Sequence, residues 1–325
     1  MQTRAVRIQQ PGGPEVLKLE TVEVAAPGPG QALLRHTAIG LNYMDTYVRT
    51  GGYASGFPSG CGGEAAAVVE AVGPGVTDVK VGDRVVYAGG EPGAYAERRL
   101  FPAARLVKIP DGITDEIAAA VMLKGMTVEY LLNRCVTLKP GNHALMYAAA
   151  GGVGLLAGQW AKHLGLKLIG VTNGADKIKL AQDAGYAVVL DRSRDDIVAR
   201  VKEITGGAGV PVVFDSVGKA TYETTLNCLS PRGFFVSFGS TTGTPPAVDG
   251  GLLQKHGSLY FTRPSLVHYT ASREDLLASA GAVFDLVGKG SLKVHIGKRY
   301  PLADIVTAHI DLEAGRTAGS TIIVP

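Results

Sequence analysis

A glycine-rich turn at residues 148–154, Ala-Ala-Ala-Gly-Gly-Val-Gly, is the part of this chain whose residue types most directly suggest chemistry. Apolar residues 144–147 precede it and predict a strand, and the apolar residues after it recur at helical spacing. A second apolar run at 168–171 completes a β-α-β unit of ordinary length. In this context glycine permits a tight turn and lets backbone N–H groups approach a pyrophosphate at the helix N-terminus. The sequence therefore predicts a dinucleotide site at this turn.

The fingerprint of such a site identifies the residues that we expect to matter. Aligned on it, Ala149 takes the place of the first glycine, Gly151 of the second and Gly154 of the third. Glycine-rich turns also serve ordinary loops, so the prediction depends on the strand before the turn and the helix after it.

The residues beyond the second strand indicate which dinucleotide binds. An NAD site usually carries an acid about 20 positions after the turn, where it binds the ribose 2′-hydroxyl. Here the residue 19 positions after Gly154 is Asn173, and the cations Lys177 and Arg192 follow. The missing acid and the two cations suit a 2′-phosphate, so we assign all three residues to this end of the cofactor and predict NADPH. The alternative is that Lys177 and Arg192 are solvated surface charges.

Length, composition and charge limit the class of protein. With 325 residues, 46% of them apolar, the chain can bury one large core or two ordinary ones, and we expect two domains. The formal net charge of +3 is too small to suggest a nucleic acid or a membrane surface as partner. We therefore expect a small-molecule substrate.

Cysteine usage and the N-terminal residues indicate the compartment. Cys61, Cys135 and Cys228 are odd in number and widely spaced, which argues against a disulfide framework and for a reducing compartment. The N-terminal residues lack the apolar core of a signal peptide, and no apolar run approaches the length that spans a membrane. We therefore predict a cytoplasmic protein.

The order of turns and apolar runs predicts the fold. Up to about residue 109, short strands alternate with Pro/Gly turns, which predicts a β-rich, partly barrel-like domain. Helix-forming sequence then breaks near Gly125, and beyond it strands alternate with helices, as in a doubly wound parallel Rossmann sheet. We predict an α/β protein with a β-rich domain formed by 1–124 and 263–325 and a dinucleotide-binding domain at 125–262.

Two strands of the predicted sheet end in small polar residues. Ligands of a doubly wound sheet bind beyond the carboxyl ends of its strands. The strands at 212–214 and 233–239 bring such residues to that edge. We therefore expect further cofactor contacts from Ser216, Phe238, Gly239 and Ser240.

Several spaced blocks match a known family along essentially the whole chain. These blocks are 12–17, 40–45, 148–154, 215–218, 237–239 and 262–265. In them the chain resembles the zinc-free quinone oxidoreductases of the medium-chain dehydrogenase/reductase superfamily, the group that includes zeta-crystallin. The resemblance implies a split, GroES-like catalytic domain, a nicotinamide in the cleft between the domains, and commonly a homodimer joined along the edge of the nucleotide-domain sheet.

The same resemblance bears on metal binding. Related zinc alcohol dehydrogenases carry a cysteine where this chain has Asn42 and a histidine where it has Gly63. The segment 89–93 is too short for the lobe that holds their structural zinc, and none of the seven histidines sits in a Cys/His cluster of metal-ligand spacing. We therefore predict no metal site.

Matching positions to the family implies further cofactor contacts. Near the nicotinamide the family implies Asn42, Asp45 and Thr46 from one domain and Thr127 and Tyr130 from the other. The remaining matches are Gly152 and Val153 at the pyrophosphate turn, Lys177 at the 2′-phosphate, and Phe238, Gly239 and Ser240 beside the nicotinamide. Arg192 departs from the tyrosine that bacterial relatives often carry, and by its charge it should strengthen the preference for NADPH.

We hypothesise that Tyr47, Tyr53 and Arg263 border the acceptor and act in catalysis. A phenol hydroxyl can hydrogen-bond a quinone carbonyl, and a guanidinium can stabilise the anion that forms. The alternatives are that Tyr47 is simply packed in a helix and that Arg263 holds the backbone before Pro264. Glu64 could be a buried polar member of the cofactor cleft, which the sequence does not decide.

The favoured function is NADPH-dependent, zinc-independent reduction of quinones to semiquinone or hydroquinone. The alternative is NADPH-dependent reduction of activated C=C bonds, as in 2-alkenals or enoyl thioesters, because related zinc-free members use the same hydride geometry. A third interpretation is an NADPH-linked RNA-binding or crystallin-like protein. The weak positive charge and the absence of a basic aromatic stripe disfavour it.

Overall fold

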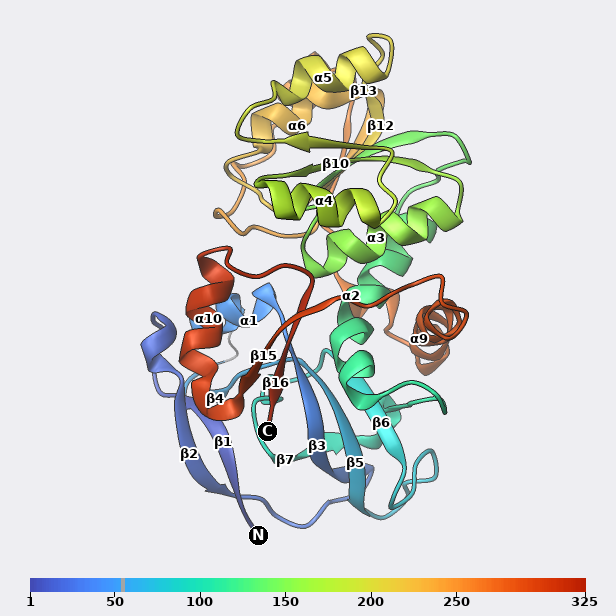
Figure 1. Ribbon diagram of the computed structural model, residues 1–325. Helices are drawn as coiled ribbons and strands as arrows, with labels where there is room; N and C mark the ends of the chain where they lie inside the picture. The colour runs from blue at the N-terminus through green and yellow to red at the C-terminus, as the bar shows by residue number, and fades with distance from the viewer. Residues whose placement is uncertain (54–55) are drawn as a thin grey trace. The chain divides into compact units, whose positions relative to one another are not determined.

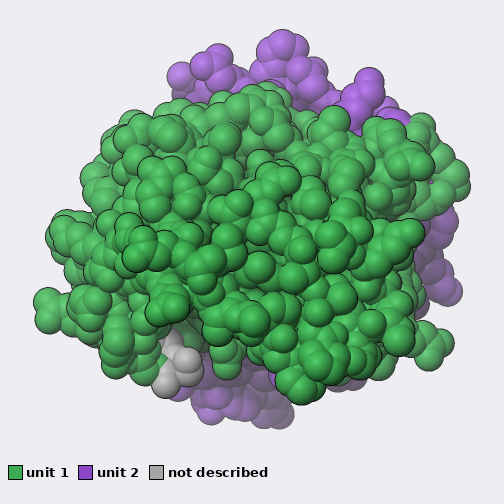
Figure 2. All heavy atoms as spheres, turned by 90° about the horizontal axis from the view of Figure 1, so that it is seen from below, with its two compact units in different colours: residues 1–126, 270–289, 294–325 green, residues 127–269, 290–293 purple. Residues whose placement is uncertain are grey.

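The computed structural model describes residues 1–53 and 56–325 (Figure 1). The chain forms two compact units, distinguished by colour in Figure 2. Unit 1 comprises Met1–Met126, Thr270–Lys289 and Val294–Pro325, and unit 2 comprises Thr127–Tyr269 and Gly290–Lys293.

Unit 2 is built on a six-stranded parallel sheet with the order β11-β10-β9-β12-β13-β14. Its strands are β9 His143–Tyr147, β10 Lys167–Thr172, β11 Val188–Asp191, β12 Val210–Asp215, β13 Leu229–Ser237 and β14 Tyr260–Thr262. Its helices are α3 Gly152–His163, α4 Ala175–Asp183, α5 Ile197–Ile204, α6 Tyr222–Cys228, α7 Gly250–Lys255 and α8 Leu266–Tyr269. The strand order reverses between β9 and β12, which is the switch point where doubly wound sheets bind ligands.

The strands of this sheet are apolar along their length because helices cover both faces. Leu145 in β9, Ile169 in β10 and Val213 in β12 are fully buried. Helices α3 and α4 pack on β10, whereas α6 packs on β12 and β13. This packing keeps the strands in place and leaves their carboxyl ends to carry loops.

Unit 1 contains two sheets. The larger has the order β15-β16-β3-β5-β6-β8, with β7 also paired to β3, and the smaller has the order β2-β1-β4. The strands are β1 Gln2–Ile8, β2 Lys18–Glu23, β3 Gln31–Leu41, β4 Ser59–Gly60, β5 Glu64–Val72, β6 Arg84–Ala88, β7 Arg98–Pro102, β8 Val107–Lys108, β15 Ile296–Pro301 and β16 Ser320–Val324. Short 3-10 helices lie at Pro14–Val16, Ala103–Arg105 and Leu302–Asp304. The predicted α/β class, a doubly wound parallel sheet with a separate β-rich domain, is confirmed.

The helices of unit 1 are α1 Tyr43–Arg49, α9 Arg273–Gly288, α10 Ile305–Glu313 and the first part of α2 Asp115–Asn133. The predicted break near Gly125 is wrong, because α2 runs through it without interruption. A Cβ at Gly125 would lie 2.7 Å from Cγ1 of Val283 in α9, so the glycine marks a close helix contact rather than a helix end. No helix in the described part of the chain has the length and apolar character of a membrane span.

Candidate functional site

The turn between β9 and α3 brings the helix directly onto the end of the strand. Ala148 has a positive φ of 55°, and Gly151 is the N-cap of α3. A Cβ at Gly154 would lie 2.3 Å from the carbonyl oxygen of Ala148 and 2.6 Å from that of Ala149, so a side chain there would displace the turn. The N–H groups of the first helical turn, 152–154, have no partner within the helix and point to where an anion can bind.

Tyr186 supports this turn from the side of the sheet. Its hydroxyl donates to the carbonyl oxygen of Gly154 at 2.8 Å. A Cβ at Gly158 in α3 would lie 2.6 Å from its ring, and one at Gly170 in β10 would lie 2.8 Å from it. The ring therefore fills the space between α3 and β10 that the two glycines leave.

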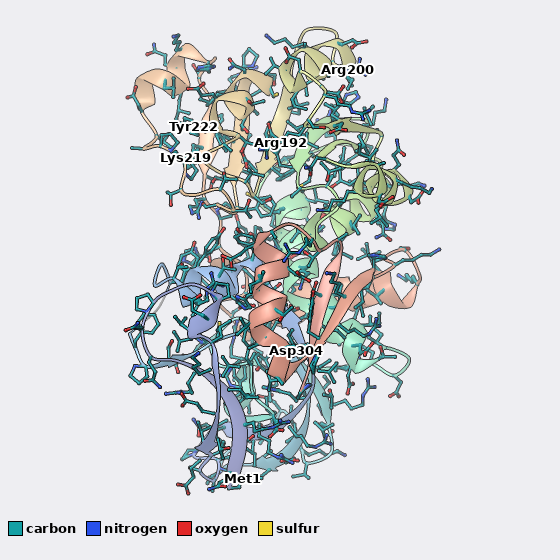
Figure 3. The ribbon with its side chains drawn as sticks, turned by 60° about the vertical axis from the view of Figure 1, so that its left-hand side comes forward. Met1, Arg192, Arg200, Lys219, Tyr222 and Asp304 are labelled. Atoms are coloured by element: carbon teal, nitrogen blue, oxygen red, sulfur yellow. The ribbon has the colours of Figure 1, made fainter. Side chains whose placement is uncertain are left out.

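The predicted adenosine end lies where β10 and β11 finish. The N–H of Arg192 donates to the carbonyl oxygen of Thr172 at 2.8 Å, so the chain segments that follow the two strands lie together. Asn173 follows β10, and Lys177 lies in the first turn of α4. The Arg192 side chain is exposed on this unit (Figure 3), and that of Lys177 is half-buried. Two cations thus flank the strand ends where a nucleotide phosphate could be neutralised.

The carboxylate of Asp215 organises the loop after β12. It is fully buried, and its Oδ1 accepts hydrogen bonds from the N–H groups of Val217 at 2.7 Å and Gly218 at 3.0 Å. Its Oδ2 accepts from the hydroxyls of Thr221 at 2.7 Å and Thr225 at 2.8 Å. Four donors therefore satisfy a buried ion and hold this loop in one conformation.

The loop after β13 packs against the loop after β12. The N–H of Phe238 donates to the carbonyl oxygen of Asp215 at 2.9 Å. A Cβ at Gly239 would lie 2.7 Å from the carbonyl oxygen of Ser216, so the two loops are in backbone contact there. Ser240 follows and is buried.

Arg263 extends this edge beyond β14. Its Nη1 donates to the hydroxyl of Ser237, the last residue of β13, at 3.2 Å, and the residue is exposed. The structure therefore brings to one edge of the sheet a large part of the predicted site: Gly151, Gly152, Val153, Gly154, Asn173, Arg192, Ser216, Phe238, Gly239, Ser240 and Arg263.

Thr127 and Tyr130 lie on α2 and are buried. The ring of Tyr130 stacks on that of Tyr269, with 4.4 Å between centroids and 9° between planes. Burial raises the pKa of Tyr130. One face of the Tyr130 ring is therefore covered by Tyr269, which also belongs to unit 2.

The predicted nicotinamide contacts of unit 1 lie at the start of α1. Asn42 is the N-cap, and Asp45 accepts its backbone N–H through Oδ2 at 2.9 Å. The Tyr95 hydroxyl donates to the same oxygen at 2.6 Å. Asp45 and Thr46 are buried, and burial raises the pKa of Asp45 to about 6, although both hydrogen bonds act to lower it.

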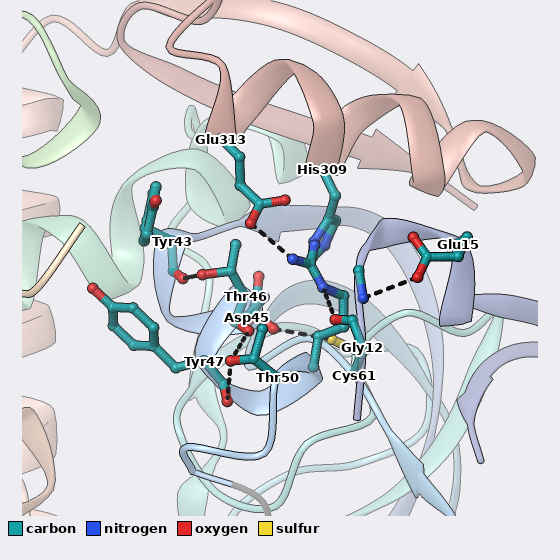
Figure 4. Close-up of polar contacts among 12 residues, drawn as sticks. Gly12, Glu15, Tyr43, Asp45, Thr46, Tyr47, Thr50, Cys61, His309 and Glu313 are labelled. Carbon is teal, nitrogen blue, oxygen red and sulfur yellow. Dashed lines mark hydrogen bonds and ion pairs between the residues drawn. The ribbon is translucent and has the colours of Figure 1, made fainter. Parts of the chain in front are cut away.

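A chain of buried polar groups continues from Asp45 through Tyr95 to α10. Figure 4 shows His309 and Glu313 of α10 on the side that faces α1. Nε2 of His309 lies 3.1 Å from the Tyr95 hydroxyl, and its Nδ1 lies 3.0 Å from Nη1 of Arg49. Because Tyr95 gives its proton to Asp45 and a guanidinium only donates, His309 donates through Nε2 and accepts through Nδ1. Burial and then Arg49 lower the pKa of His309 to about 3, which agrees with this neutral tautomer. Arg49 also pairs with Glu313 at 2.7 Å, so the network ties α10 to α1.

A further buried carboxylate lies beside Asn42. Glu64 is fully buried at the start of β5, and its Oε2 accepts from Nδ2 of Asn42 at 2.9 Å and Nζ of Lys124 at 3.1 Å. Its Oε1 accepts from the N–H of Leu123 at 2.6 Å. The carboxylate is therefore hydrogen-bonded through both oxygens.

The predicted acceptor residues of unit 1 form an aromatic row. The rings of Tyr47 and Tyr53 meet edge to face with centroids 5.5 Å apart, and Tyr43 meets Tyr47 in the same way at 5.6 Å. Tyr53 is 54% exposed, whereas Tyr47 is half-buried in α1. Tyr47 is thus partly packed, and Tyr53 offers the more exposed ring.

Cys61 is buried, and its thiol donates to the carbonyl oxygen of Asp45 at 3.6 Å. Burial raises its pKa well above the usual value, so the thiol is not a ready nucleophile. Within residues 1–53 and 56–325, no group of three or more His, Cys, Asp or Glu side chains is placed to hold a metal ion.

The sequence analysis did not predict that Lys124, Tyr95 and His309 hold the buried carboxylates in place. Lys124 carried a usable signal, because it is a cation in an otherwise apolar helical stretch, 117–126. Tyr95 and His309 have no such signal in the sequence. Tyr95 contacts Asp45, and His309 contacts Tyr95, each across a long separation in the chain.

Comparison with known proteins identifies relatives along the whole chain. Residues 28–111 match the alcohol dehydrogenase GroES-like domain, and residues 152–289 match the zinc-binding dehydrogenase family. A quinone oxidoreductase of Pseudomonas aeruginosa is 49% identical over 97% of each chain. A 2-haloacrylate reductase of a Burkholderia species is 41% identical over 99% of this chain and 98% of its own. The crystal structure of Escherichia coli quinone oxidoreductase complexed with NADPH is 45% identical, with a TM-score of 0.97 over 99% of this chain and 100% of its own.

Proposed function

Because this chain belongs to the quinone oxidoreductase family of the medium-chain dehydrogenase/reductase superfamily, we propose that it is an NADPH-dependent reductase of quinones. The observation that carries the proposal is the carboxyl edge of the unit 2 sheet. There a glycine turn suited to a pyrophosphate and two cations suited to a 2′-phosphate follow neighbouring strands. NADPH supplies a hydride when it is bound.

Each part of the cofactor has residues whose chemistry fits it. The N–H groups of 152–154 bind the pyrophosphate. Lys177 and Arg192 bind the 2′-phosphate, and Asn173 avoids the repulsion that an acid there would cause. The residues proposed around the nicotinamide are Asn42, Asp45, Thr46, Thr127, Tyr130, Ser216, Phe238, Gly239 and Ser240.

The acceptor is bordered by Tyr47, Tyr53 and Arg263. A phenol hydroxyl donates to a quinone carbonyl, and a guanidinium stabilises negative charge that develops on its oxygen. The exposure of Tyr53 and the position of Arg263 at a strand end support these roles. No covalent nucleophile is required for this chemistry.

The reaction needs no zinc. Asn42 and Gly63 stand where related zinc enzymes carry a cysteine and a histidine. The Glu64 carboxylate accepts hydrogen bonds from this same Asn42 and from the ammonium of Lys124. A divalent cation at this position would be repelled by that ammonium.

Reduction of activated C=C bonds is the second candidate. The observation that favours it is the 41% identity to a relative named 2-haloacrylate reductase, whose substrate is an alkene conjugated to a carboxylate. Both candidates need the same cofactor site, and they differ in the acceptor that the Tyr47, Tyr53 and Arg263 side chains recognise.

The test is anaerobic oxidation of NADPH with 1,4-benzoquinone, 9,10-phenanthrenequinone or a 2-alkenal as acceptor. We expect quinone-dependent oxidation with little turnover of the alkenal. Electron paramagnetic resonance then shows whether the quinone product is a radical or the two-electron hydroquinone. Preference for the alkenal would replace the proposed function by the second candidate.

We also propose that the protein forms a homodimer along the β14 edge. Tyr260 on this edge strand is 53% exposed and stacks on Phe234 of β13. An exposed aromatic strand at a sheet edge favours pairing with a second chain. Sedimentation velocity should show a dimer that Tyr260→Lys weakens, and a wild-type monomer at micromolar concentration would contradict this proposal.

A further inference from the structure

The contacts of Glu64 determine which way the Asn42 side-chain amide is turned. The Glu64 carboxylate is fully buried and forms an ion pair with Lys124, which is 5% exposed. A carboxylate in this state accepts hydrogen bonds and cannot donate them. The Asn42 atom 2.9 Å from it must therefore be the NH2 nitrogen.

A second contact agrees with this orientation. Nδ2 of Asn42 also lies 3.4 Å from the carbonyl oxygen of Gly40, another group that can only accept. Both hydrogens of the amide thus face acceptors of the chain. The amide oxygen Oδ1 is turned away from them, toward the backbone N–H of Asp45, with which it completes the capping box at the start of α1. An amide oxygen has two lone pairs, so Oδ1 can accept a second hydrogen bond from a ligand.

The surroundings keep this arrangement from relaxing. A Cβ at Gly40 would lie 2.2 Å from Oε2 of Glu64, so there is no room for a side chain between the backbone of β3 and the carboxylate. The N–H of Leu123 holds the other oxygen at 2.6 Å. Glu64 therefore cannot turn to release the amide without breaking contacts to both β3 and α2.

We propose that Glu64 and Lys124 are positioning residues that lock Asn42 so that it offers an acceptor, Oδ1, to the nicotinamide nucleoside. This inference rests on the proposed NADPH site. The cofactor group that meets Asn42 is then a hydrogen-bond donor, either the carboxamide NH2 or a ribose hydroxyl. An Asn42 free to turn would also offer a donor, and the lock removes that choice.

A swap of donor and acceptor tests the lock. In N42D two carboxylates meet, and in E64Q the amide is free to turn and Lys124 loses its anion. In the double variant N42D/E64Q, the amide introduced at position 64 is expected to donate to the carboxylate introduced at position 42. The charge of the cluster is then unchanged, and the outer oxygen at position 42 still accepts. We expect each single variant to weaken NADP⁺ binding about tenfold or more and the double variant to return to within about threefold of wild type.

NADP⁺ affinity is measured by calorimetry beside thermal unfolding. Val69→Ala, a core change on the same strand as Glu64, is the matched control and should lower stability without changing NADP⁺ affinity. Affinity of E64Q equal to wild type, or a double variant no better than the single variants, overturns the inference. If the single variants do not fold, the double variant alone decides by the same threefold criterion. A wild type that does not bind NADP⁺ or NADPH refutes the proposed function instead.

The acetylpyridine analogue of NADP⁺, which lacks the carboxamide NH2, separates the two possible donors. Weaker binding of the analogue to wild type, with the loss reduced in E64Q, assigns the donor to the carboxamide. Equal binding of analogue and NADP⁺, together with weak binding by E64Q, assigns it to a ribose hydroxyl. In both cases Asn42 acts as the acceptor.

Discussion

Replacing Asp45 by asparagine should change how stability depends on pH. Asp45 is 1% exposed, and its pKa is raised to about 6, mainly by burial. A carboxyl whose pKa is higher in the folded than in the unfolded state stabilises the fold while it is protonated. That stabilisation is complete below the unfolded value, near pH 4, and is lost as the pH rises through about 6.

The magnitude follows from the two pKa values. Between the ordinary value of 3.8 and about 6, the free energy of unfolding of the wild type should fall by about 3 kcal/mol relative to D45N. Asparagine does not titrate, and its oxygen can still accept from Tyr95 and from the backbone N–H of Asn42. The pH dependence therefore isolates the charge rather than the loss of these contacts.

Urea unfolding of wild type and D45N at pH 4, 5, 6 and 7 measures this difference. His36 and His309, whose pKa values burial lowers to about 3, destabilise both proteins as the pH falls below 6.5, so their effect cancels in the comparison. We expect the stability of D45N minus that of wild type to increase from pH 4 to pH 7. A difference that is constant, or that decreases with pH, would refute the inference that burial raises the pKa of Asp45.

Three further predictions concern the turn, the loop and the acceptor. G154A should lose about 1–3 kcal/mol of stability and bind NADPH more weakly, because a Cβ there meets two carbonyl oxygens. G250A, which meets nothing within 4 Å, should be neutral in the same urea and binding measurements. Thr225→Val should cost about 1–3 kcal/mol, since it removes one of four donors from a buried carboxylate; an unchanged urea midpoint would contradict this. Y53F and R263A should each raise the KM for quinone several-fold without changing NADPH affinity, and if neither changes turnover or KM, the acceptor assignment fails.

The parts of the fold that the sequence predicts are those encoded locally. The turn at 148–154 lies between an apolar strand and an amphipathic helix, and the structure has β9 and α3 there. The helix interruption predicted near Gly125 is wrong. Glycine at this position makes room for the close contact between α2 and Val283, which is far away in the chain.

The candidate site also contains residues that the sequence predicts and contacts that it does not. The residues after β10, β11, β12 and β13 could be predicted because parallel strands bring their carboxyl ends to one edge of a sheet. The pairing of Glu64 with Lys124 and the chain from Asp45 to His309 could not, because they join segments 50 or more residues apart through side-chain packing. Periodicity carries no information on such contacts.

The most direct test of the central claim is the ratio of NADH to NADPH dissociation constants for wild type and for the double variant K177A/R192A. Two charge-assisted contacts to a 2′-phosphate contribute about 3 kcal/mol or more, so the wild type should prefer NADPH by about 100-fold or more. In the double variant most of this preference should disappear while NADH affinity stays within about twofold. A wild type that binds NADH as tightly as NADPH, or a double variant that keeps the full preference, would contradict the account.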